Sequence, residues 1–174
     1  MFSESAVKAR IRAINGYPKK GILFMDITTL IKDAGAFQEC INELAGRLAS
    51  INIEYIVGIE ARGFITGSAL AYKMNKGFIP VRKKGKLPYE TIGMEYVLEY
   101  GTDTIEMHRD ALESGSNIVI ADDLLATGGT AKAVSELVEK AGGTVSAFAF
   151  IVELEDLKGR EKINDYKIIS LVKY

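Results

Sequence analysis

An uninterrupted apolar run that ends in two carboxylates constrains the fold of this chain more than any other feature. Residues Ile118 to Ala121 form the run, Asp122 and Asp123 follow it, and a turn rich in glycine and threonine comes next. A short apolar run of this kind predicts a strand buried on both faces, as in a parallel sheet covered by helices. Open sheets of that type bind ligands at the carboxyl ends of their strands. The sequence therefore predicts an α/β fold with a binding site directly after Ala121.

The turn has the composition of an anion site. Gly128 and Gly129 let the backbone approach a ligand closely, and the helix expected to follow offers free amides and its positive dipole end. The phosphate-binding residues are therefore expected to be Ala126, Thr127, Gly128, Gly129 and Thr130. Asp122 and Asp123 repel phosphate but can accept hydrogen bonds from neighbouring hydroxyl groups, of which a ribose supplies two. The alternative is a helix cap and a turn without a ligand. Neither G-x-x-x-x-G-K-S/T nor G-x-G-x-x-G occurs, so the usual nucleoside-triphosphate and dinucleotide loops are missing.

The composition excludes several classes of partner. With 22 basic and 23 acidic residues among 174, the net charge is −1, and no overall positive field attracts nucleic acid. Cys40 is the single cysteine, so no intrachain disulfide can form. Neither a signal peptide nor an apolar stretch of ~20 residues is found. We therefore expect one cytoplasmic domain over residues 1–174 that binds a small molecule, with no nucleic acid and no membrane as partner.

Apolar periodicity predicts alternating helices and strands. Ser3 or Ser5 can cap a first helix that runs to Ile14 and closes at Asn15 and Gly16. Further helices are predicted over residues 36–50, with Cys40 on the core face, and over 64–74, 130–141 and 157–163. Strands are predicted over residues 55–59, 78–81, 118–121, 144–152 and 168–172. Such alternation is typical of a parallel α/β sheet.

The pattern changes between residues 83 and 110. Gly85, Gly93 and Gly101 punctuate two stretches, 94–100 and 104–107, whose residues alternate like exposed antiparallel strands. We expect this segment to form an antiparallel flap over the sheet, because segments that cover a site are a common way to exclude water.

Four segments together resemble one enzyme family. Asp-Asp-Leu-Leu-Ala-Thr-Gly-Gly-Thr, at 122–130, is similar to the phosphoribosyl diphosphate (PRPP) signature of type I phosphoribosyltransferases, in the form found in adenine phosphoribosyltransferases. Val-Gly-Ile-Glu-Ala-Arg-Gly-Phe at 57–64 and Val-Arg-Lys-Lys-Gly-Lys-Leu-Pro at 81–88 resemble two further family motifs. A fourth motif, Pro-x-x-Gly-Ile-x-Phe-x-Asp-Ile-Thr, matches residues 18–28. All four occur in the family's order, and the resemblance covers nearly the whole chain.

This resemblance implies a fold and a reaction. The fold is the parallel-sheet type I phosphoribosyltransferase fold with helices on both faces, a small amino-terminal hood (1–34) and the antiparallel flap (83–110). The reaction converts adenine and PRPP to AMP and pyrophosphate, as part of purine salvage. Two alternatives remain: transfer to another base, such as hypoxanthine, guanine or xanthine, and a PRPP- or nucleotide-sensing regulator without turnover.

Basic residues after two predicted strands are candidates for binding pyrophosphate. Arg62 offers a forked donor geometry, and Arg82, Lys83 and Lys86 belong to a basic run. By composition alone these could be solvated surface charges, but the resemblance assigns them to pyrophosphate. It also implies a homodimer in which Arg82 reaches the neighbouring site. Mg²⁺ is expected to arrive with the diphosphate, held by ligand oxygens and water, so no protein metal ligand is predicted.

The flap carries the candidate catalytic residue. Leu-Glu-Tyr-Gly at 98–101 is similar to a family segment whose glutamate is thought to protonate the purine, which makes Glu99 the candidate general acid. A carboxyl group closed under a flap can have its pKa raised by desolvation, as proton transfer near neutral pH requires. The alternative is an exposed strand glutamate. Tyr100 is expected to cover the site.

The hood is expected to read the base. Phe24 can stack on a purine face, and the resemblance implies that the main chain of Leu23 and Met25 binds the edge of adenine. Packing of Phe24 in the core is the alternative. Two residues depart from the family pattern: arginine is common where Met25 stands, and a small residue is common where Tyr89 stands. The first departure makes the choice of base less certain than the binding of PRPP.

Overall fold

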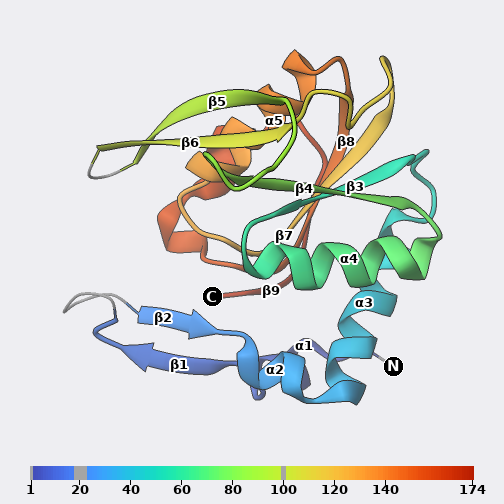
Figure 1. The fold of residues 1–174 in the computed structure, drawn as a ribbon. Helices are drawn as coiled ribbons and strands as arrows, with labels where there is room; N and C mark the ends of the chain where they lie inside the picture. Colours follow the sequence, from blue (N-terminus) through green and yellow to red (C-terminus); the bar gives the residue numbers. More distant parts are fainter. Residues whose placement is uncertain (1, 18–22, 99–100) are drawn as a thin grey trace.

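The computed structural model describes residues 2–17, 23–98 and 101–174. The strands of its central sheet are β3 (Tyr55–Ile59), β4 (Gly77–Lys83), β5 (Thr91–Leu98), β6 (Gly101–His108), β7 (Asn117–Leu125), β8 (Thr144–Glu153) and β9 (Ile168–Lys173). Within the described residues these seven strands have the order β5-β6-β4-β3-β7-β8-β9 (Figure 1). β4, β3, β7, β8 and β9 each pair in parallel with the next strand. β6 pairs antiparallel with both β4 and β5. The predicted α/β fold with a parallel sheet is confirmed.

Helices cover both faces of the sheet (Figure 1). The three longest in the described part of the chain are α3 (Ala34–Leu48), α4 (Arg62–Met74) and α5 (Gly129–Lys140). Successive residues of β7 face opposite sides: Ile118 and Ile120 pack in the core beneath α5, and Val119 and Ala121 in the core beneath α3 and α4. This alternation explains why the strand is apolar throughout. None of the helices that the structure describes is both long and apolar enough to cross a membrane.

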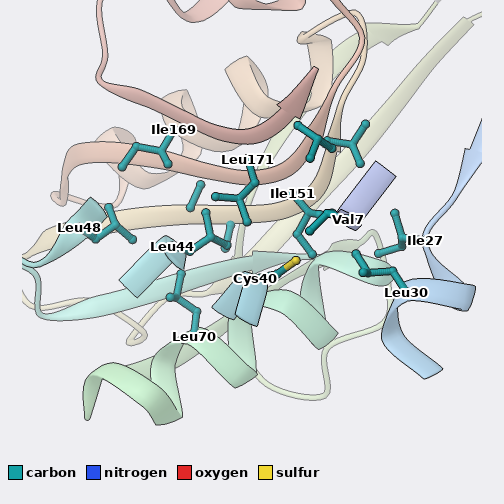
Figure 2. Packing of buried hydrophobic residues seen from close by; sticks show 14 of the residues in the cluster. Val7, Ile27, Leu30, Cys40, Leu44, Leu48, Leu70, Ile151, Ile169 and Leu171 are labelled. Carbon is teal, nitrogen blue, oxygen red and sulfur yellow. The ribbon is translucent and has the colours of Figure 1, made fainter. Parts of the chain in front are cut away.

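The core on the α3 side is drawn in Figure 2. Leu44 and Leu48 of α3 belong to one hydrophobic cluster with Leu70 of α4 and Ile151 of β8, and all four side chains are fully buried. Cys40 lies in the same core, as its place in the helical pattern predicts. Burial raises the pKa of its thiol to about 11, which keeps this cysteine protonated at neutral pH.

The predicted first helix is wrong beyond its first turns. Helix α1 spans only Glu4–Lys8, and the chain then forms β1 (Arg12–Asn15), which pairs antiparallel with β2 (Leu23–Asp26). A helix this short has little stability of its own, so the ladder with β2 determines the conformation of residues 12–15. Gly16, which the pattern assigns to a helix end, has a φ of +78° directly after β1. The short helix α2 (Thr28–Lys32) follows β2.

Two further segments differ from the sequence-based expectation. The helix predicted over 157–163 is a pair of 3₁₀ turns, η1 (Glu155–Leu157) and η2 (Gly159–Ile163), separated by Lys158 with a φ of +52°. The predicted antiparallel hairpin forms as β5 and β6, but it extends the edge of the central sheet through the pairing of β6 with β4. Figure 1 shows the hairpin reaching past the end of β4.

Candidate active site

The carboxyl ends of β3, β4 and β7 lie side by side. Gly58 in β3 pairs with Pro80 in β4 on one side and with Ala121 in β7 on the other, in parallel register. The segments that leave these three strands therefore emerge at one edge of the sheet, where open α/β folds bind their ligands. The two predicted acids lie in the last part of β7, Arg82 and Lys83 end β4, and Arg62 begins α4 directly after β3. The topology thus brings together residues that lie far apart in the sequence.

Arg62 connects two of the predicted site residues. Its Nε donates a hydrogen bond of 2.5 Å to Oδ2 of Asp123. Its guanidinium carbon lies 5.5 Å from the centre of the Phe24 ring, within the range of a cation–π contact. The side chain of Asp123 is only 4% exposed and that of Arg62 is 42% exposed, so the ion pair leads from a buried acid to the surface. The ribose candidate and the adenine candidate are thus joined through one arginine.

Gly63 allows α4 to begin this close to β7. A Cβ atom on Gly63 would lie 2.7 Å from Oδ1 of Asp122 and 2.9 Å from the carbonyl oxygen of Ala121, closer than real Cβ contacts. Any side chain here would push the start of α4, and Arg62 with it, away from the acids. The 57–64 motif therefore needs its second glycine for backbone approach as well as its arginine for charge.

Asp122 and Asp123 lie in unlike surroundings. Oδ1 of Asp122 accepts a hydrogen bond of 2.8 Å from the backbone amide of Asp123. Burial and the neighbouring Asp123 carboxylate raise the pKa of Asp122 well above its usual range, and the charge of Arg62 offsets this only in part. Asp122 therefore retains a proton more readily than an exposed aspartate would.

The 126–130 loop forms a small pocket at the start of α5. The pocket has a volume of about 90 Å³, and all five loop residues line it together with Asp122. Gly128 caps the helix with a φ of +74°, a conformation that glycine adopts without strain. The amides of the first turn have no carbonyl partner within the helix, and they lie at its positive end. Free amides at a helix start attract anions, and the binding of phosphate by this loop stays a prediction.

The basic run at the end of β4 makes its contacts within its own chain. Arg82 donates from Nη2 to Oε1 of Glu60 and from Nη1 to the carbonyl of Lys86, both at 2.9 Å. Lys83 forms an ion pair of 3.0 Å with Asp103. The hydrogen bond from Arg82 lowers the pKa of Glu60. The sequence analysis did not identify Glu60 as the partner of Arg82. Its place inside the 57–64 motif could have pointed to it.

The hood strand β2 places its three candidates differently. Leu23 is 47% exposed, whereas the side chain of Met25 is buried and packs in the core on the α3 side. Phe24 lies between them, half-buried, with its ring edge-on to Tyr17 at a centroid distance of 5.1 Å. The alternative of core packing therefore describes Met25 better than Phe24. Because its side chain points into the core, Met25 contributes to the site at most through its main chain.

The two flap candidates, Glu99 and Tyr100, lie outside the described residues. Among the residues that the structure does describe, no group of three or more histidine, cysteine or acidic side chains is arranged to hold a metal ion.

Comparisons with known proteins agree with this geometry. Residues 28–173 match the family model described as "Phosphoribosyl transferase domain". The adenine phosphoribosyltransferase of Brachyspira hyodysenteriae is 56% identical over 168 residues, covering 97% of this chain and 99% of that protein. The crystal structure of the enzyme of that name from Thermoanaerobacter pseudethanolicus superposes with a TM-score of 0.96 at 51% identity, covering 99% of this chain and all of the other. The Saccharomyces cerevisiae enzyme, complexed with an imino-altritol bisphosphate and adenine, gives a TM-score of 0.91 at 40% identity, covering 97% of each chain.

Proposed function

The chain belongs to the adenine phosphoribosyltransferases, and we propose that the residues gathered at the ends of β3, β4 and β7 carry out the reaction of this family. The enzyme transfers the phosphoribosyl group of PRPP to adenine, with AMP and pyrophosphate as products, and so serves purine salvage. The observation that carries this conclusion is 56% identity over 97% of the chain with a relative of that name. The roles of single residues below are our proposal.

The sugar phosphate is assigned to β7 and the loop after it. Asp122 and Asp123 accept hydrogen bonds from the two ribose hydroxyls, and the 126–130 loop holds the 5′-phosphate through its amides and threonine hydroxyls. Asp122 and the loop line one pocket, which supports a ligand that carries both groups. AMP and PRPP share this ribose 5-phosphate portion, so substrate and product use the same subsite.

Arg62 is proposed to change partners when PRPP binds. It occupies Oδ2 of Asp123 in the free protein, where a ribose hydroxyl would otherwise be accepted. The incoming diphosphate offers the guanidinium a partner of higher charge, with the bidentate geometry that arginine favours. We therefore assign Arg62 to pyrophosphate in the complex and to Asp123 in the free enzyme.

The reaction at the anomeric carbon of the ribose determines which charges the site must stabilise. The bond to the pyrophosphate oxygen breaks and a bond to the purine nitrogen forms, while positive charge builds on the ribose and negative charge on the leaving group. Arg62, Arg82, Lys83 and Lys86 are proposed to stabilise the leaving pyrophosphate. Magnesium, when bound to the diphosphate, neutralises part of the same charge.

The base is assigned to the hood and the flap. Phe24 stacks on the purine while the main chain of Leu23 and Met25 reads its edge, and a wrong base leaves backbone groups unpaired at about 1 to 3 kcal/mol each. Adenine loses a proton as its nitrogen bonds to the ribose. Glu99 is proposed to accept that proton and to return it in the reverse direction, where it is the general acid. Tyr100 is proposed to cover the closed site.

The experiment that tests this function supplies magnesium and PRPP with adenine, hypoxanthine, guanine or xanthine in turn. Nucleotide formation is followed by chromatography, and AMP alone is the expected product. A different nucleotide would contradict the assignment of the hood while keeping that of the PRPP site. PRPP binding without any product would favour a sensing role.

Replacing Asp122 by asparagine separates stability from function. The folded pKa of Asp122 is raised, so its charged form destabilises the free protein at neutral pH, and this cost disappears as the pH falls through the folded pKa. Asp122→Asn is therefore expected to be more thermostable than the wild type at pH 7 but not at low pH. Its affinity for AMP is expected to fall about tenfold, because one charge-assisted hydrogen bond to ribose is lost. Calorimetry measures both quantities, and an unchanged AMP affinity would reject the ribose assignment.

We propose that the enzyme is a homodimer with Arg82 serving the neighbouring site, in the cytoplasm. Ile65 and Tyr72, two turns apart on α4, are 41% and 90% exposed, which leaves an apolar face on the helix that starts at the site. A second copy of the chain is the partner that would cover it. Light scattering of the purified protein measures the assembly directly.

Mixing two inactive variants tests where Arg82 acts. Arg82→Ala and Asp123→Asn each impair every site of their own dimer. If Arg82 acts across the interface, a mixed dimer has one intact site, so random mixing restores about a quarter of wild-type activity. If Arg82 acts in its own chain, mixing restores nothing. Each variant alone, incubated in the same way, is the control.

A further inference from the structure

Two glycine backbones touch at the edge of the 126–130 loop. A Cβ atom on Gly128 would collide with the carbonyl oxygen of Gly159, and one on Gly159 would collide with the carbonyl oxygen of Ala126. Gly159 begins η2, far along the chain from the loop. The loop's shape therefore depends on where η2 is held, because the two backbones pack without any intervening side chain.

An ionic cluster around the buried Glu153 holds the start of η2. Arg160, the residue after Gly159, donates from Nε to Oε1 of Glu153 at 2.8 Å and from Nη2 to Oε2 at 2.6 Å. The Ser170 hydroxyl donates to the same Oε2 at 2.5 Å. The side chain of Glu153 is 5% exposed and that of Arg160 is 39% exposed, so the two-pronged pair joins a buried acid to a partly exposed arginine. The cluster of Glu153, Arg160 and Ser170 thus fixes Arg160, and Gly159 beside it, to β8 and β9.

The same glutamate is also in register with the strand that leads into the loop. Glu153 pairs with Leu125 at the end of β7, and the amide of Leu154 donates to the carbonyl of Leu125 at 2.9 Å. Leu125 is directly followed by Ala126. A continuous set of contacts therefore runs from the end of β7 through Glu153, Arg160 and Gly159 and returns to the 126–130 loop.

We infer that the Glu153, Arg160 and Ser170 cluster positions the 126–130 loop for the 5′-phosphate of PRPP and AMP. An ion pair with one partly exposed partner adds little to stability, whereas its forked hydrogen bonds favour one geometry. The contact with Gly159 transmits that geometry to the loop. Arg160 is thus a positioning residue that does not touch the substrate, and the inference rests on the proposed phosphate role of the loop.

The test compares Arg160→Met with the double variant Glu153→Gln/Arg160→Met. The single change leaves the buried Glu153 with the Ser170 hydroxyl but without its cation, which destabilises the protein. The double change removes both charges and keeps the fold measurable. For the double variant we expect the KM for PRPP and the dissociation constant of AMP to rise about tenfold, as for other small displacements of binding groups. The KM for adenine and the kcat are expected to change by less than about twofold, since the hood is untouched.

Glu155→Gln is the matched control. It breaks the ion pair of 2.7 Å between Glu155 and Lys173. This pair lies at the same end of β9, but both of its side chains are exposed to solvent. This variant is expected to keep wild-type affinity for AMP. Equal increases in the KM values for PRPP and adenine would overturn the inference, because general loosening of the fold affects both substrates.

Thr130→Val separates this inference from the role of the loop. It removes a hydroxyl of the loop itself and is expected to weaken AMP binding about tenfold through one lost charge-assisted hydrogen bond. If Thr130→Val weakens AMP binding and the double variant does not, the positioning role alone is rejected. If neither variant weakens it, the phosphate assignment of the loop fails and the inference fails with it.

Discussion

The Glu99→Gln enzyme is expected to turn over at least about a hundredfold more slowly than the wild type, because a group that transfers a proton in the transition state contributes about 10²- to 10⁴-fold. Glutamine keeps the size and the hydrogen-bonding oxygen of the side chain but cannot exchange a proton. The KM values for PRPP and adenine are therefore expected to change by no more than a few fold, and kcat carries the loss.

Steady-state kinetics over a range of pH measure this effect. The wild type should show a limb of the pH profile that Glu99→Gln lacks. Glu95→Gln is the matched control, because Glu95 is an exposed glutamate in β5 of the same hairpin. A Glu99→Gln enzyme with wild-type turnover would remove Glu99 from the proton-transfer role.

Gly63→Ala is expected to impair both folding and substrate binding. The new methyl group would lie 2.7 Å from a carboxylate oxygen of Asp122 and 2.9 Å from a backbone carbonyl, so α4 must move outward. Overpacking of this kind costs about 1 to 3 kcal/mol of stability. The movement also takes Arg62 from Asp123, and a displacement of about 1 Å at a binding group can reduce kcat/KM roughly a hundredfold.

Gly46→Ala is the control for a glycine in a helix. Gly46 lies in α3, where a Cβ atom would meet nothing within 4 Å, so the exchange should stabilise the protein by about 0.5 to 1 kcal/mol. Thermal unfolding and kcat/KM of both variants give the comparison. If Gly63→Ala had the same stability and kcat/KM as Gly46→Ala, the close approach of α4 to β7 would not be needed for folding or substrate binding.

The parts of the candidate site that lie in one continuous stretch of sequence could be predicted from the sequence. The run from Ile118 to Thr130 contains strand, acids, turn and helix start in one stretch, so local patterns place them together without knowledge of the rest. The alternation of both faces in β7 is the physical reason for its unbroken apolar character. Periodicity also placed Cys40 correctly, since a helix buries one stripe of side chains.

The errors and omissions concern partners that are distant in sequence. Residues 12–15 carry a helical pattern, yet pairing with β2 makes them a strand. The ion pair of Arg62 with Asp123 joins residues 61 positions apart, and no local pattern predicts it. The contact between Gly128 and Gly159 is of the same kind, because a glycine signals only that backbone freedom is needed, not which backbone approaches.

Arg62 contacts both Phe24 and Asp123, so the base and sugar subsites that we propose at these two residues are expected to be thermodynamically linked. A ligand that draws the guanidinium away from Asp123 also changes what lies over the Phe24 ring, so occupancy of the sugar subsite alters the free energy of binding at the base subsite. Linkage is reciprocal: whatever factor PRPP applies to the affinity for adenine, adenine applies to the affinity for PRPP. One shared cation thus couples the affinities of the two proposed subsites.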